Sequence, residues 1–205
     1  MKPARIDPRI LRTRAALREA LVGLLRDHRF EDLTLNEIAA ASGLNRATIY
    51  KHHADKFALL DAVIADELQH RLLAATGDAA PSGGSKLAAV VAAACLALQW
   101  VASLGRSDDR LLRPIAEARI RSLLRHVVEY GLAEKLVTTT LRPELAAAMA
   151  SAAIYGAADA WTRGAATSQR ALDAYVAKVL AALDGVIAPS TQPFVRPQRP
   201  LTFDA

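Results

Sequence analysis

The chain has 205 residues, a formal net charge of +5 and an apolar fraction of 52%. This length suits one domain or two small ones, and it is enough to bury a core. The apolar fraction excludes a chain that is disordered throughout. Alanine is abundant, which favours helices. Cys95 is the single cysteine, so the chain cannot form an internal disulfide, and we expect it to be a buried small residue.

Signals for export or membrane insertion are missing from the sequence. The first 14 residues are charged but contain no apolar core, so we expect no signal peptide. The longest apolar run, residues 87–98, is shorter than the roughly 18 residues of a membrane span. We therefore expect a cytoplasmic protein with no membrane partner.

The positive charge is concentrated near the N-terminus. Residues 1–56 hold 11 basic and 7 acidic residues, whereas residues 57–188 hold 13 of each. Residues 189–205 add 2 basic residues and 1 acidic residue. A basic excess in one segment is the distribution expected if that segment meets nucleic-acid phosphates, although many solvated surfaces carry as much charge.

The first predicted helix covers residues 8–28. Asp7 is suited to the N-cap and Pro8 to the first helical position. Apolar residues then recur at helical spacing, with arginines on the other faces. A solvated amphipathic helix explains this pattern, and the preceding arm could also lie beside a DNA backbone.

Two short helices follow, at residues 35–41 and 46–52. Thr34 and Glu37 have the spacing of a capping box, and Asn45 is a good N-cap for the second helix. Gly43 lies where a helix end favours a left-handed residue. Two short helices joined by a tight turn predict a helix-turn-helix. We expect Ile38, Leu44 and Ile49 to hold the two helices together.

The second of these helices is rich in hydrogen-bond donors on its remaining faces. A helix of this kind suits a groove lined with phosphates and acceptor base edges. Lys56 lies in the first turn of the next predicted helix, which Asp55 should cap. A cation there is unfavourable for the helix alone, but it can share a phosphate with the free backbone amides.

Residues 34–56, TLNEIAAASGLNRATIYKHHADK, and the LL pair that follows resemble the DNA-binding region of the TetR-type transcriptional regulators. The resemblance extends over about residues 13–63. His53 departs from the pattern, which usually has Phe there, and Ser42 stands where Ala is common. The matching positions are Thr34, Ile38, Ala39, Gly43, Leu44, Thr48, Ile49, Tyr50, His52, Lys56, Leu59 and Leu60.

The resemblance implies a homodimer that binds double-stranded DNA. We expect the helix that Asn45 caps to enter the major groove, with Arg46, Thr48 and Lys51 at base edges and Asn36 as a weaker candidate. The candidates for phosphate contacts are Thr34, Tyr50, His52 and Lys56.

The remaining segments predict an all-α protein. Further helices are expected at residues 56–75, 86–104, 114–136, 143–163 and 170–187. Residues 77–85 are a Gly-rich linker, residues 138–140 a loop, and residues 189–205 a Pro-rich tail. We predict a helix-turn-helix domain at 1–55 and a helical-bundle domain for ligand sensing and dimerisation at 56–188.

The last two predicted helices carry stripes at a spacing of three and four residues. Each stripe could pair with its copy in a second chain, or it could pack within one chain. The resemblance favours the dimer, because TetR-type regulators dimerise through their last two long helices. The first stripe comprises Ala146, Ala150, Ala153, Ala157, Ala160 and Gly164, and the second Leu172, Val176, Val179, Leu183 and Val186.

No pattern in the sequence indicates catalysis. The nucleophile elbow, the P-loop and the dinucleotide fingerprint are missing, and the histidines are not spaced as metal ligands. We expect no enzyme activity, no cofactor and no metal. A small apolar effector in the second domain is the better hypothesis, and the candidates for its pocket are Trp100, His126, Tyr130, Tyr155 and Asp159.

These expectations combine into a transcriptional regulator, a repressor that a small apolar effector releases from a palindromic operator. The alternative is a constitutive dimeric DNA-binding protein without a small-molecule ligand.

Overall fold

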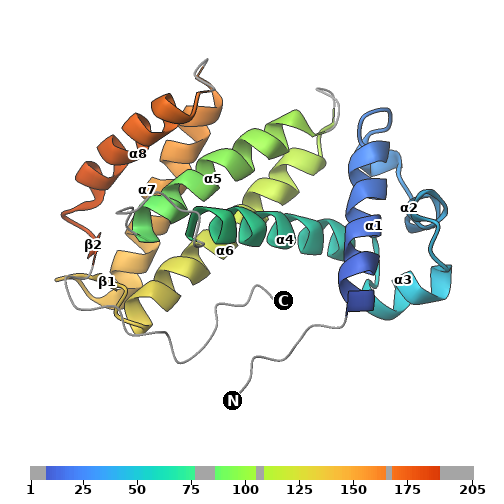
Figure 1. The fold of residues 1–205 in the computed structure, drawn as a ribbon, viewed down its shortest axis with the longest axis horizontal. Coiled ribbons are helices and arrows are strands. Elements are labelled where there is room, and N and C mark those ends of the chain that lie inside the picture. Colours follow the sequence, from blue (N-terminus) through green and yellow to red (C-terminus); the bar gives the residue numbers. More distant parts are fainter. Residues whose placement is uncertain (1–7, 77–85, 105–108, 165–167, 190–205) are drawn as a thin grey trace. The chain divides into compact units, whose positions relative to one another are not determined.

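The computed structural model describes residues 8–76, 86–104, 109–164 and 168–189, and its elements are almost all helical. The all-α class predicted from the sequence is confirmed. In chain order the elements are α1 (Pro8–Leu24), the 3-10 helix η1 (Phe30–Asp32), α2 (Leu35–Ser42), α3 (Arg46–His52), α4 (Lys56–Thr76), α5 (Lys86–Ser103), α6 (Leu112–Ala133), β1 (Val137–Thr138), α7 (Pro143–Thr162), α8 (Gln169–Leu183) and β2 (Ala188–Pro189) (Figure 1).

The chain divides into two compact units. The first contains Met1–Ile64 and Ser103–Ala116, and the second contains Ala65–Ala102 and Glu117–Ala205. The first unit thus holds the start of α4 and the N-terminal end of α6 in addition to the three short N-terminal helices. In Figure 1 these three helices, blue to cyan, form one group.

The core of the first unit is built from helical positions that the periodic pattern predicts to be apolar. Leu17 and Leu21 of α1 are at most 1% exposed, as is Phe30 of η1. Ile38 of α2 and Ile49 of α3 are fully buried as well. The short helices α2 and α3 therefore rely on shared burial, because isolated helices of this length are unstable in water.

Helix α6 starts and ends earlier than its sequence suggests. Its start is fixed by Asp109, whose Oδ1 accepts hydrogen bonds from the amides of Leu111 (3.1 Å) and Leu112 (2.9 Å). Asp109 therefore caps the turn that leads into α6. At the other end Lys135 adopts a left-handed φ of 54°. The amide of Leu136 then donates to the Gly131 carbonyl (2.8 Å). The sequence did not indicate this helix end, because the left-handed position is occupied by Lys135 and not by a glycine.

A two-residue antiparallel ladder joins β1 to β2, with Val137 opposite Pro189 and Thr138 opposite Ala188. The sequence predicts a loop at the first segment and a tail at the second, because neither is long enough to show an alternating pattern. The hydroxyl of Thr139 also donates to the carbonyl of Val186 (2.7 Å). The segment after α8 is thus fixed to the loop before α7.

Helix α5 has 18 residues and is apolar enough to cross a membrane by length and composition. The uninterrupted apolar run within it is still shorter than a membrane span, because the helix also contains Lys86, Gln99 and Ser103. Among the described residues, α5 is the one helix of this kind. Half of it is buried inside the protein, Cys95 included, as in the core helix of a folded domain. The linker predicted at 77–85 and the tail from residue 190 lie outside the described residues.

Candidate functional site

The helix-turn-helix is held by the local contacts that its sequence predicts. The Thr34 hydroxyl accepts from the Glu37 amide (3.2 Å), while the Glu37 carboxylate accepts from the Thr34 amide (2.7 Å), so the capping box is present. Gly43 ends α2 with a φ of 67°. The Asn45 side chain then caps α3 through the Ala47 amide (2.9 Å). These caps fix the direction of α3 relative to α2.

One side of α3 is buried and the other faces solvent. Ile49 is fully buried, Leu44 in the turn is half-buried, and Thr48 is also half-buried. Arg46 and Lys51 are exposed. The burial of Ile49 therefore orients the basic residues away from the core of the unit.

The exposed side of α3 carries donors and no carboxylate. Between Glu37 and Asp55 the chain contains no acidic residue. Tyr50 is 50% exposed, although it is large and partly apolar, and its hydroxyl makes a long contact of 3.5 Å with the Asn36 side chain. Asn36 and Asn45 are exposed too. The side chain of His52 lies outside the described residues.

The surroundings of Lys56 differ from those expected of a phosphate ligand. Its ammonium donates to three backbone carbonyls at the end of η1, those of Phe30 (2.9 Å), Glu31 (2.7 Å) and Leu33 (2.7 Å). An ammonium has three donors, so these carbonyls use all of them. It also lies over the Phe30 and Phe57 rings, 5.1 Å and 5.6 Å from their centroids. Lys56 thus anchors η1 to the start of α4.

Thr34 is also engaged within the protein. Its hydroxyl donates to the Glu37 carboxylate (2.7 Å) in addition to accepting from the Glu37 amide. These hydrogen bonds from Thr34, side chain first and backbone second, hold the pKa of Glu37 below its ordinary value of 4.5. Glu37 is thus an ionised partner of Thr34 in the first turn of α2.

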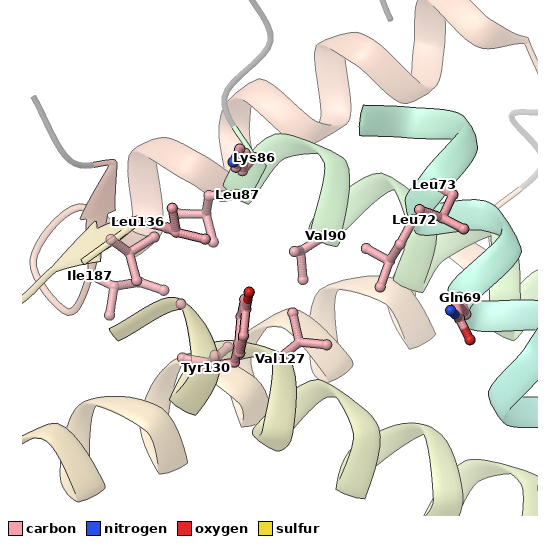
Figure 2. A pocket seen from close by; sticks show the side chains of 13 residues that line it. Gln69, Leu72, Leu73, Lys86, Leu87, Val90, Val127, Tyr130, Leu136 and Ile187 are labelled. Atoms are coloured by element: carbon pink, nitrogen blue, oxygen red, sulfur yellow. The ribbon is translucent and has the colours of Figure 1, made fainter. Parts of the chain in front are cut away.

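The second unit contains an apolar cavity of about 290 Å³. The cavity lies among the end of α4, the start of α5 and the end of α6. In Figure 2 the Tyr130 hydroxyl points from α6 into the space below α5. Its lining includes Gln69, Leu72, Leu73, Lys86, Leu87, Val90, Val127, Tyr130, Leu136 and Ile187.

Of the five predicted pocket residues, Tyr130 alone lines this cavity. Trp100 is half-buried and His126 is exposed. Tyr155 is 9% exposed and lies under the Arg121 guanidinium, 4.0 Å from the ring centroid, while Asp159 pairs with Arg163 (2.6 Å). The lining residues come from both sides of the linker, so their proximity depends on tertiary packing that helical periodicity does not show.

The comparisons with known proteins agree with the helix-turn-helix geometry. Residues 17–63 match the family model described as bacterial regulatory proteins, tetR family. Residues 17–63 are therefore a DNA-binding region of the TetR type. Members of this family are DNA-binding transcriptional regulators. The matched segment covers α2, the turn and α3, the part that the sequence analysis related to this family.

Individual relatives of this chain are distant. It is 38% identical over 64 residues to the HTH-type transcriptional regulator YxbF of Bacillus subtilis (strain 168); these residues are 31% of this chain and 17% of that protein. A TetR-family regulator from Rhodococcus sp. shares its fold with a TM-score of 0.52 at 18% identity, over 86% of this chain and 98% of that one. FadR of Bacillus subtilis, solved with stearoyl-CoA, has a TM-score of 0.50 at 19% identity, over 84% and 98%.

The two stripes expected at a dimer interface are partly buried within the chain. Ala146 and Ala150 of α7 are fully buried, whereas Ala153 and Ala160 are exposed and Ala157 is half-buried. On α8 the residues Leu172, Val176 and Leu183 are buried, and Val179 is half-buried. The predicted positions therefore face mainly into the unit, since α7 and α8 also pack on each other.

A neighbouring face of α7 is open and apolar. Leu145 and Met149 are each 44% exposed, and Ala152, Gly156 and Ala160 continue the face at exposed positions. This surface, which we call the α7 outer face, is displaced by about one residue from the predicted stripe. The shift arises because both sides of α7 carry small residues, so spacing alone does not show which side the core takes.

Titratable side chains are dispersed in the described part of the chain. No group of three or more His, Cys, Asp or Glu residues there could hold a metal ion.

Proposed function

We propose that the protein is a homodimeric DNA-binding transcriptional regulator, a repressor that a small apolar effector releases from a near-palindromic operator. The observation that carries this proposal is the exposed side of α3, which is rich in donors and free of carboxylates. A helix of this kind fits the major groove, where base edges and flanking phosphates are mostly acceptors.

Each exposed residue of α3 has a distinct proposed role. Arg46 and Lys51 contact base edges, because their side chains are exposed and can reach guanine acceptors. Thr48 is half-buried, and its short side chain offers a hydroxyl or a methyl group to a base. Tyr50 donates to a phosphate. For this the hydroxyl must leave its long 3.5 Å contact with the Asn36 side chain, to which it donates in the free protein. Asn36 remains the weaker candidate for a base.

Dimerisation is proposed to use the α7 outer face together with the exposed side of α8. Burial of the exposed side chains of Leu145 and Met149 against a second chain lowers the free energy of association. The small residues Ala152 and Gly156 allow a second helix to approach closely. A two-fold dimer presents two copies of α3, and it therefore needs half-sites spaced by about one helical turn, roughly 34–36 Å, or slightly more.

The effector part of the proposal rests on the cavity in the second unit. FadR of Bacillus subtilis, which is similar in fold, was solved with stearoyl-CoA, and some TetR regulators bind small-molecule ligands. An effector shifts this protein away from the operator only through its different affinity for the two conformations. We place the protein in the cytoplasm, where it meets chromosomal DNA, and assign it no catalytic role.

Selection of binding sites from random duplex DNA with the full-length chain tests the proposal. The expected outcome is an enriched near-palindrome, whose base preferences relax at defined positions in Lys51→Ala. Arg125→Ala, which removes an exposed charge from α6, is the control and should select the wild-type sequence. Recovery of no sequence preference by the folded wild-type protein would contradict the proposal.

A further inference from the structure

The cavity of the second unit has a cation at its rim. Lys86, the first residue of α5, is exposed at the rim, and beside it the walls are formed by apolar side chains such as Leu87 and Val90. The hydroxyl of Tyr130 points into the space between (Figure 2). A cation next to an apolar chamber is the arrangement that suits an amphiphile with a negative head.

The volume limits the size of the occupant. An engineered apolar cavity of about 150 Å³ holds benzene, which has six carbon atoms. A cavity of about 290 Å³ has roughly twice this volume and therefore accommodates on the order of twelve non-hydrogen atoms. An intact acyl-CoA exceeds this size several-fold, so the cavity does not enclose the whole of a ligand such as the one bound to FadR.

We propose that this cavity binds a single-chain amphiphilic anion, with an apolar tail of about ten carbons between α4, α5 and α6 and a carboxylate-like head on the Lys86 ammonium. The regulatory meaning of this binding rests on the function proposed above. The binding itself rests on the cavity alone.

The electrostatics of the two polar groups agree with such a ligand. Burial lowers the pKa of Lys86, which means that its surroundings penalise the positive charge. A bound anion offsets this penalty. Burial, together with the nearby Glu134 carboxylate, raises the pKa of Tyr130. The Tyr130 hydroxyl thus keeps its proton at neutral pH and is a donor inside the cavity.

The aliphatic wall agrees with a flexible tail rather than a planar ring system. Leu72, Val127 and Ile187 are at most 7% exposed and present branched aliphatic surface. Each methylene of a tail buried against such side chains contributes favourably to binding. Among the described residues, Tyr130 is the one aromatic side chain that lines the cavity.

Calorimetry on the full-length chain with three ten-carbon probes tests the inference. Decanoate, decanol and decyltrimethylammonium share the tail and differ in the charge of the head. Decanoate should bind most tightly. In Lys86→Gln its affinity should fall by about fivefold, the upper range for a solvent-accessible ion pair, while decanol should bind unchanged. Arg125→Gln, which removes the same charge from α6 outside the cavity lining, should leave the affinity for decanoate unaltered.

Filling the cavity provides a second test. Val90→Trp should abolish the binding of decanoate and decanol alike, and Val127→Phe serves if the first variant fails to fold. Equal affinity for decanoate and the cationic probe would overturn the inference. Decanoate binding that survives a folded, filled-cavity variant would overturn it as well.

The same experiments separate this inference from the proposed function. Binding of decanoate with the expected response to Lys86→Gln supports the inference even if no DNA sequence is selected, in which case the proposed function alone fails. If a near-palindrome is selected but none of the three probes binds, the inference fails and DNA-binding regulation stands.

Discussion

The Asp109 carboxylate accepts a hydrogen bond of 2.6 Å from the backbone amide of Phe30, which lies 79 residues earlier in the chain. Oδ2 makes this contact, while Oδ1 caps the first amides of α6. Both partners belong to the first unit. One carboxylate therefore joins the start of α6 to the 3-10 helix that precedes the helix-turn-helix.

Replacement of Asp109 by Ala should lower the free energy of unfolding by about 2 kcal/mol, since it removes a helix cap and leaves the Phe30 amide without its partner. Urea denaturation followed by circular dichroism measures this change. Asp109→Asn keeps an acceptor and should cost less. A loss below about 0.5 kcal/mol in Asp109→Ala, the usual range for surface substitutions, would contradict the bridging role.

Lys56 and Lys51 should respond differently to truncation. Lys56→Met should destabilise the protein by about 2 kcal/mol, because three carbonyls at the end of η1 lose a charged donor. This variant should leave the slope of log K against log salt nearly unchanged. Lys51→Ala should reduce that slope by about 1 if Lys51 contacts a phosphate as well as a base edge.

The selected DNA sequence, titrated at several salt concentrations, gives both slopes. Lys56→Arg keeps the charge but not the compact geometry, so it should be destabilised without a change in slope. If Lys56→Met flattens the slope as much as Lys51→Ala does, Lys56 contacts a phosphate in the complex, as the sequence alone suggested.

There is room for a side chain at Gly43, but the backbone conformation there disfavours one. A Cβ at this position would meet no atom within 4 Å, but its φ is 67°. Gly43→Ala should therefore cost about 1 kcal/mol through strain alone. Gly23, within α1, also has open space but no positive φ, so Gly23→Ala is the matched control and should stabilise by about 0.5–1 kcal/mol. Thermal unfolding of both variants decides this; equal effects would contradict the strain argument.

The features predicted well from the sequence are those fixed by neighbours in the chain. The capping box of Thr34 and Glu37, the turn at Gly43 and the cap at Asn45 each depend on residues within four positions. The family resemblance added the role of α3 to this local geometry.

The features that the sequence did not reveal depend on contacts across the chain. Lys56 meets carbonyls more than twenty residues away, and no local signal marks those partners. The cavity combines residues from either side of the linker, so Lys86 was not among the expected lining residues. Aromatic residues such as Tyr155 instead pack under a charged neighbour.

The capping box should make stability depend on pH in the acid range. Because the pKa of Glu37 is lowered in the folded protein, its ionised form stabilises the fold above the ordinary pKa of 4.5. This contribution is lost as the pH falls through the lower folded value. Glu37→Gln should thus be less stable than wild type near neutral pH, with the difference shrinking below pH 4.5. Chemical denaturation across this range measures it, and a constant difference would contradict an electrostatic origin.

The α7 outer face should decide the oligomeric state. Met149→Glu places a charge on an exposed apolar side chain, so folding should survive while burial against a partner becomes unfavourable. Sedimentation should show a shift from dimer to monomer. Leu111→Glu, at a comparable 39% exposure in the first unit, is the control and should remain dimeric. A Met149→Glu protein that stays dimeric at micromolar concentration would place the interface elsewhere.

Ala153→Leu distinguishes the predicted stripe of α7 from the α7 outer face. It should split the dimer only if the predicted stripe forms the interface.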